Sequence, residues 1–252
     1  MTTIVSPFIL RRVVASPEIH YIWDDWNTEL VEEPPNKAVV EALTRISFRG
    51  LVAFATSTAE WILARFIGLL DTTLPESFVE AAWVAQIDRR YLAQDWEDHP
   101  DADEDNWRGP IRGPIGNAMT ELMYAGQQAE SMENPELQVG WMTNLAAHVL
   151  VDPQPYIAWR KWILAKFQTE YPRSSNDAKG SVVPRETCDP DAAFAVNLTE
   201  GAINALLARA RAGKNPFLNS PEALKSLKRI GFDGQPYLFD QGSDRTERMG
   251  EC

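Results

Sequence analysis

Apolar residues recur at helical spacing through most of the chain that follows Asn36. Asn36 has the short polar side chain that caps the first turn of a helix, and the apolar positions after it repeat every three or four residues. The pattern predicts helical structure to about residue 69, as two helices broken near Gly50. A turn at 71–73 follows, and Pro75 then begins a further helix that runs to about Tyr91.

Later helix starts share a local pattern in which a capping residue directly precedes proline. Proline suits the first turn because its fixed φ matches the helix and no hydrogen bond is lost there. In three of the four cases an acidic residue follows, where it interacts favourably with the positive end of the helix dipole. The pattern predicts helices that open at Asn134, Asp152, Asp189 and Ser220. A helix over 115–132 is expected before them, and a polar loop over 173–187.

Two hexads indicate an internal repeat. Residues 61–66 read Trp-Ile-Leu-Ala-Arg-Phe, and residues 162–167 read Trp-Ile-Leu-Ala-Lys-Phe. Weaker matches occur in the same order on both sides of the hexads. This self-similarity predicts a duplicated helical unit, roughly 36–94 and 135–210, whose copies cover each other's apolar stripe. The alternative is that ordinary amphipathic helix sequence recurs here by chance.

The segment 95–116 between the two units has a different composition. It holds seven carboxylates and no Lys or Arg before Arg108, and a Gly/Pro run follows at 109–116. Dense carboxylates repel one another and resist burial, while Gly and Pro interrupt regular structure. The segment is therefore expected to be an exposed connector.

A calcium loop is the alternative for this connector. Asp101, Asp103 and Asp105 alternate like the first ligands of an EF-hand. However, Asn106 occupies the glycine position and Arg112 the position of the bidentate Glu. No metal and no cofactor is therefore expected.

The N-terminal residues carry a second acidic patch. Short apolar pieces broken by Pro7 and Pro17 predict a strand or an extended arm packed on the body. Residues 18–33 then hold six carboxylates and no Lys or Arg, interleaved with Tyr21, Trp23 and Trp26. This composition is similar in kind to that of the connector.

Together these patterns predict a mostly α fold, either a multi-helix bundle or a short α-solenoid built from two similar helical units with a short extended N-terminal segment. We expect one helical domain over 1–252. Its parts are an N-terminal arm with an acidic-aromatic patch (1–35), helical unit 1 (36–94), the connector (95–116), helical unit 2 (117–212), and a C-terminal helix and tail (213–252).

Net charge restricts the classes of binding partner, and cysteine content indicates the cellular location. Lys and Arg total 24 against 36 Asp and Glu, a net charge of -12, which argues against nucleic acid or an anionic membrane as the partner. Only Cys188 and Cys252 are present, too few for a disulfide scaffold or a zinc cluster, and a reduced cytoplasmic location is expected. The N-terminus lacks the order of a signal peptide, and no apolar run approaches the ~18 residues of a membrane span.

Catalytic motifs are missing from the sequence. There is no HExxH or CxxC pair, no G-x-S-x-G elbow and no phosphate-binding glycine loop. An enzyme would need a metal or acid/base site assembled from scattered residues such as Asp98, His99, Glu121 and His148. The absence of motifs favours a protein that is not an enzyme.

The two acidic-aromatic patches therefore suggest binding to a basic protein. Carboxylates steer a basic partner, and aromatic side chains supply the desolvated anchors that dominate interface energy. The specific expectation is an immunity- or antitoxin-like inhibitor of a basic toxin or nuclease; the alternative is a helical scaffold that assembles with itself. The predicted contact residues are Asp95, Trp96, Glu97, Asp98, Asp101, Asp103, Glu104, Asp105 and Trp107, with Trp23, Asp24, Asp25 and Trp26 as the second patch.

Overall fold

The computed structural model describes residues 5–25, 33–93, 106–192, 215–220 and 223. These ranges are mostly helical and contain no β-strand, which confirms the predicted mostly α bundle. The α-helices are α1 (Pro7–Leu10), α3 (Lys37–Leu43), α4 (Phe48–Arg65), α5 (Leu74–Ala85), α6 (Gly109–Glu130), α7 (Glu136–Val149) and α8 (Gln154–Glu170). Two 3-10 helices, η1 (Arg89–Tyr91) and η4 (Arg185–Cys188), complete the described elements.

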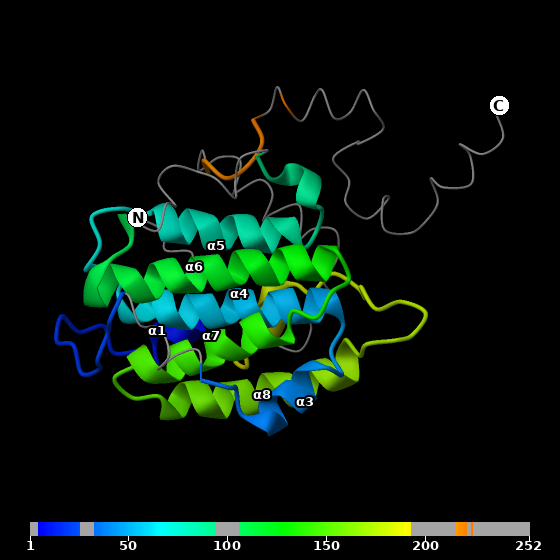
Figure 1. Ribbon diagram of the computed structural model, residues 1–252, viewed down its shortest axis with the longest axis horizontal. Helices are drawn as coiled ribbons and strands as arrows, with labels where there is room; N and C mark the ends of the chain where they lie inside the picture. The colour runs from blue at the N-terminus through cyan, green and yellow to red at the C-terminus, as the bar shows by residue number, and fades with distance from the viewer. Residues whose placement is uncertain (1–4, 26–32, 94–105, 193–214, 221–222, 224–252) are drawn as a thin grey trace.

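Helix α4 lies at the centre of the bundle. Figure 1 shows α5 and α6 on one side of it and α7 and α8 on the other, and α4 contacts all four. Every residue from Phe48 to Arg65 is buried, because the sequence of this helix is apolar or small around almost its whole circumference. Helices from both predicted units thus pack on one central helix.

Aromatic side chains join α4 to α8 and to the N-terminal turn. The rings of Phe54 and Trp159 stack with their centroids 5.7 Å apart, and Trp61 lies 5.7 Å from Trp159. Phe8 of α1 meets Trp61 edge to face at 6.0 Å. The N-terminal arm is therefore packed on the body, as predicted, and contains one short helical turn.

The break between the first two helices lies earlier than predicted. Asn36 caps α3 as expected, since its Oδ1 accepts a hydrogen bond from the backbone N–H of Ala38 at 2.9 Å. The chain then leaves the helix at 44–47, and Ser47 caps α4 through the N–H of Gly50. Gly50 itself lies inside the first turn of α4, so the break predicted near Gly50 lies a few residues before it, at 44–47.

Helix α6 begins at Gly109, earlier than the residue 115 predicted from the sequence. The Gly/Pro run 109–116 is thus helical rather than part of a connector. Pro110 occupies the first turn, where proline is tolerated. Pro114 lies only one turn further in, so a single intrahelical hydrogen bond is lost.

Of the later proline starts, those at Asn134 and Asp152 open helices as predicted, whereas the described residues 190–192 after Asp189 form a turn. Helix α7 begins at Glu136, next to Pro135, and α8 begins at Gln154, whose N–H donates to Asp152 Oδ1 at 3.0 Å. Most of the helix expected after Asp189, and most of the one expected after Ser220, lies outside the described residues. The two hexads occupy the C-terminal halves of α4 and α8, and the duplication itself stays a prediction.

Candidate functional site

The N-terminal arm, residues 5–25, starts at a buried carboxylate in the middle of α4. Glu60 is 1% exposed, and its Oε2 accepts a hydrogen bond from the backbone N–H of Ser6 at 3.0 Å. The same carboxylate accepts from Trp83 Nε1 at 2.7 Å and is bridged by both Nε and an Nη of Arg185 at 2.9 and 3.0 Å. A buried charge with this many partners is well compensated. Glu60 thus fixes the arm, α5 and η4 to α4.

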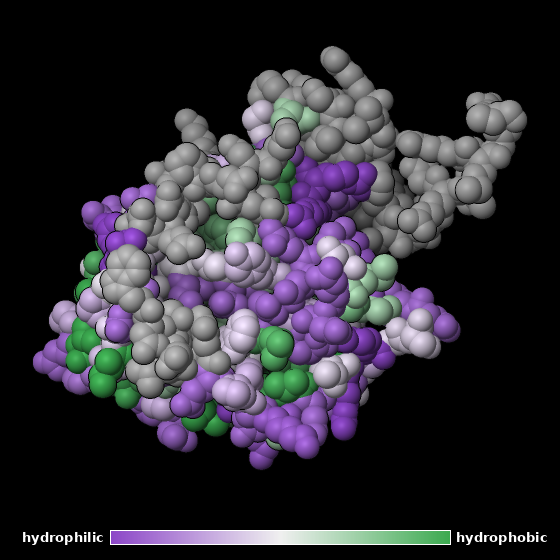
Figure 2. Space-filling model, in the orientation of Figure 1, coloured by the Kyte–Doolittle hydropathy of each residue, from purple (hydrophilic) through white to green (hydrophobic). Residues whose placement is uncertain are grey.

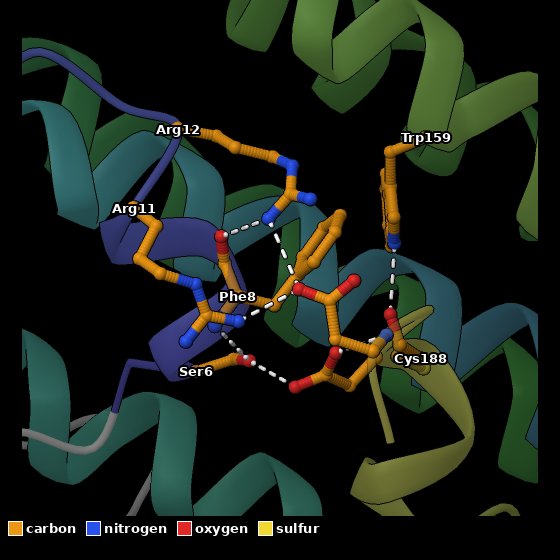
Figure 3. A network of polar contacts seen from close by, with 8 residues as sticks. Ser6, Phe8, Arg11, Arg12, Trp159 and Cys188 are labelled. Carbon is orange, nitrogen blue, oxygen red and sulfur yellow. Dashed lines mark hydrogen bonds and ion pairs between the residues drawn. The ribbon is translucent and has the colours of Figure 1, made fainter. Parts of the chain in front are cut away.

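The first turn of the arm is also held by the segment that follows η4 (Figure 3). Arg11 pairs with Asp191 at 2.7 Å, and Arg12 approaches the same carboxylate at 3.4 Å. The hydrogen bond from Arg11 is the main cause that lowers the pKa of Asp191. Ser6 Oγ lies 3.3 Å from an oxygen of Asp189. These groups are largely exposed, so their contacts fix the position of the arm more than they stabilise the fold.

Arg65 holds the centre of the arm. Its side chain is fully buried in the last turn of α4, and its guanidinium donates to three backbone carbonyls. Two belong to the arm, those of Ser16 and Glu18 (2.6 Å), and the third is that of Val149 at the end of α7 (3.2 Å). The C-terminal ends of α4 and α7 both carry partial negative charge, which compensates the buried cation.

Two further contacts carry the arm across the end of α7 to α6. His148 Nε2 lies 2.8 Å from the carbonyl of Ile22, and its ring packs 5.4 Å from that of Tyr21. The Tyr21 hydroxyl donates to the carbonyl of Pro110. That carbonyl lacks its usual helical donor because residue 114 is proline. Burial raises the pKa of Tyr21 to about 12, and the nearby Arg65 opposes this shift.

The second patch of the sequence lies against the first turn of α6. Asp25 accepts the backbone N–H of Gly109 with both carboxylate oxygens, at 2.9 and 3.0 Å, and Trp23 Nε1 at 2.6 Å. A carboxylate is stabilising at this position because the first N–H groups of a helix are unpaired and positively polarised. The Trp23 ring fills the space beside Gly113, where a Cβ would lie 2.1 Å from Nε1. The end of the arm therefore packs against the Gly/Pro run, with Trp23 beside Gly113 and Asp25 bound to Gly109.

Trp107, one of the predicted aromatic contact residues, is buried. Its side chain is 6% exposed, and it packs against Gly116, where a Cβ would lie 2.4 Å from Trp107 Cβ. It belongs to the core of the bundle and offers little ring surface to a partner. Asp25 is likewise occupied by its own chain. The sequence had treated both residues as contact residues.

What remains exposed at this end of the molecule is a mixed apolar and acidic surface, which we call the arm face. Its apolar side chains are Val14, Ile22 and Val151, exposed by 57%, 73% and 41%. Figure 2 shows hydrophobic residues among hydrophilic ones along the edge where Figure 1 places the arm. The exposed acids of the arm face are Glu18, Asp24 and Asp152, together with Asp71, which pairs with Arg112 at 2.6 Å.

The other predicted contact residues lie outside the described residues: Asp95, Trp96, Glu97, Asp98, Asp101, Asp103, Glu104, Asp105 and Trp26. Among the described ones, the structure brings Trp23 and Asp25 of one patch close to the end of the other, since Asp25 binds the N–H two residues after Trp107. The sequence treated these as separate patches.

The structure offers no support for a metal site within the described residues. No group of three or more His, Cys, Asp or Glu side chains there could hold an ion. Of the scattered candidates, Glu121 is buried on α6 and His148 contacts the arm, while Asp98 and His99 lie outside the described residues. No helix in the described ranges is long and apolar enough to cross a membrane.

Glu60 and Arg65 are the two residues that sequence reasoning missed. Both are ionisable residues inside a mostly apolar eighteen-residue helix in which every residue is buried, and which also contains Arg49. A charge in such a run is rarely buried without a specific partner, so their position was the available signal.

Comparison of the chain with protein-family models, curated proteins and solved structures gives no match. A function therefore has to be argued from the arm face alone.

Proposed function

We propose that this chain is an acidic binding protein that docks a basic protein through the arm face, most specifically as an immunity- or antitoxin-like inhibitor. The observation that carries the proposal is the composition of the arm face: three exposed aliphatic side chains beside exposed carboxylates, on a chain with a net charge of -12. Exposed apolar side chains can be desolvated by a partner, while surrounding charges remain at the rim.

The division of roles follows from the chemistry. Ile22, the most exposed of the apolar residues, supplies burial on binding, at about 25 cal/mol for each Å² removed from water. Glu18 and Asp24 steer a positively charged partner and set its orientation, an effect that is stronger in association rate than in affinity.

The acids of 95–105 belong to the same proposal. The described chain that follows this segment enters α6 beside the arm, because Asp25 binds the N–H of Gly109. We assign steering contacts to its carboxylates and to Asp24 of the arm, and anchoring contacts to the aromatic side chains of Trp96, Trp23 and Trp26. Trp107 is left out because it is buried.

Site-specific photocrosslinking tests the proposal in the cell of origin. A photoreactive amino acid replaces Ile22, and a matched probe replaces Glu133, which is exposed in the connection between α6 and α7. The expected result is a basic protein captured from Ile22 and absent from the Glu133 probe.

The captured protein is then purified and titrated with the chain. Binding should weaken at least tenfold between 50 and 300 mM salt, since exposed charges are screened beyond about 10 Å at 0.1 M. Asp24→Lys should weaken it further, and Glu133→Lys should leave it unchanged. Binding that is insensitive to salt and to Asp24→Lys contradicts the proposal.

Self-assembly is the second candidate, and a different surface favours it. Met132 lies in the α6–α7 connection and Leu137 in the first turn of α7, and they are 68% and 50% exposed. Sedimentation equilibrium tests this directly: a stable oligomer that Leu137→Glu dissociates, in the absence of any other protein, supports a scaffold.

A further inference from the structure

The arm between Val14 and Trp23 is not held by secondary structure. These residues form no backbone–backbone hydrogen bond with the described part of the chain. The carbonyls of Ser16, Glu18 and Ile22 are bound instead by side chains of the body. Segments without a backbone ladder open at low free-energy cost unless such contacts hold them.

Arg65 is the buried member of these contacts. It binds the carbonyls of Ser16 and Glu18, and it binds Val149 at the same time, so one guanidinium joins the arm to the ends of α4 and α7. Only arginine presents several donors in a rigid planar fork; a lysine ammonium at this position would not reach three carbonyls in one geometry.

The two apolar positions of the arm face that belong to the arm lie on either side of this contact. Val14 precedes Ser16 by two residues, and Ile22 follows Glu18 by four. Both side chains are largely exposed. Val14 is placed by the bound carbonyls of Ser16 and Glu18 that follow it, whereas Ile22 is also held by its own carbonyl, which contacts His148.

We propose that Arg65 is a positioning residue that orders the arm and thereby forms the arm face. The binding part of this inference rests on the proposed function; the ordering part does not. Removal of the guanidinium releases residues 14–20 from the body while the helices stay folded, because the carbonyls of Ser16 and Glu18 lose their donor. Tyr21, Ile22 and Trp23 keep their own contacts with α6 and α7.

Cleavage by a glutamate-specific protease reads this contact directly. The protease cuts after Glu18, whose side chain is 78% exposed and accessible, while its scissile carbonyl is bound by Arg65. The Glu18–Ile19 bond should be cut at least tenfold faster in Arg65→Met than in the wild type. Arg65→Lys should give an intermediate rate.

Arg45→Met is the matched control. It removes an identical side chain from an exposed position before α4, at the opposite end of that helix from Arg65. Its rate of cleavage after Glu18 should equal the wild-type rate. Equal rates in Arg65→Met and the wild type would overturn the proposal.

Gly113→Val keeps the test decisive if Arg65→Met does not fold. The new side chain would collide with Trp23, whose Nε1 lies 2.1 Å from the position of a Cβ, and it lifts the end of the arm without touching Arg65. If Arg65 holds the centre of the arm, the Glu18–Ile19 bond stays protected in Gly113→Val. Cleavage there as fast as in an unfolded chain contradicts the proposal.

Crosslinking from Ile22 separates the two proposals. If cleavage accelerates in Arg65→Met and capture of the basic partner falls at least fivefold, both stand. If cleavage accelerates and capture is unchanged, the arm is ordered by Arg65 but does not form the binding surface, which overturns the binding part. If cleavage is unchanged, the ordering part is wrong whatever the capture shows.

Discussion

The two hexads that suggested an internal repeat occupy different environments in the folded chain. In α4 the hexad is buried throughout; in α8 Trp162 is half-buried and Ala165 is exposed. The environments differ most at Ala64 and Ala165, since the first is buried and the second is exposed, and the single sequence difference follows one position later. Arg65 is fully buried on three carbonyls, whereas Lys166 is partly exposed, 3.9 Å from Glu170 and over the ring of Trp162.

This difference shows how similar helix sequence can serve two purposes. In α8 one face is buried and the basic residue keeps its charge in water, as in an ordinary amphipathic helix. In α4 no face reaches water, so every polar group needs a partner inside the protein. The substitution of Lys by Arg meets that need.

The largest expected contrast is between the two tryptophans of the hexads. Trp61→Ala should destabilise the protein by about 4 kcal/mol, because it removes a ring that packs against Phe8 and Trp159. Trp162→Ala should cost about 1 kcal/mol, since its ring is half-exposed. Urea unfolding measures both. Equal losses would show that the two hexads are equally buried.

The residues that precede the hexads should differ almost as much. Glu60→Gln leaves Arg185 without its carboxylate and should cost about 3 kcal/mol. Lys161→Gln changes an exposed residue and should cost less than about 0.5 kcal/mol. Thermal unfolding of the two variants at pH 7 compares them. A loss in Glu60→Gln as small as in Lys161→Gln would mean that the buried ion pair contributes little.

Replacing Arg65 with lysine, and Lys166 with arginine, tests how far each hexad depends on its own basic side chain. Arg65→Lys should cost about 2 kcal/mol, because at least one buried carbonyl loses its donor. Lys166→Arg should change stability by less than about 0.3 kcal/mol, since its ion pair with Glu170 is partly exposed. If Arg65→Lys is as neutral as Lys166→Arg, the fork geometry is unimportant.

The smallest expected effect concerns the buried face of α8. Burial raises the pKa of Tyr156 to about 12, above its value of about 10 in the unfolded chain. The native state therefore holds the proton more tightly, so this contribution is intact below pH 9 and is lost as the pH rises toward 12. Stability should fall by about 1 kcal/mol between pH 9 and 10.5, and Tyr156→Phe should remove that part of the slope.

Sequence periodicity located the helices because one-sided burial repeats every 3.6 residues, as in α7 and α8. It placed α6 too late, since its glycines mark close packing with Trp23 and Trp107 rather than a break. Periodicity could not show which residues of α4 face which neighbour, because this helix is buried on all sides and has no exposed polar face.

The contacts of the arm were beyond sequence reasoning for a different reason. Asp25 binds Gly109 and Arg65 binds Ser16 across 84 and 49 residues of chain. No short-range sequence pattern can indicate a contact between residues that are so far apart in the chain. Acidic composition identified the segment, but only the fold shows that Asp25 is bound inside and Asp24 faces outward.

The complete burial of α4 also has a consequence during synthesis. This helix ends at residue 65, while α8, the last of the long helices that cover it, ends at residue 170. At roughly 5–20 residues per second, the ribosome needs on the order of 5–20 s to produce the intervening chain. For that time an eighteen-residue segment without a polar face emerges before its covering helices exist. The growing chain is then a natural client for chaperones that bind apolar sequence.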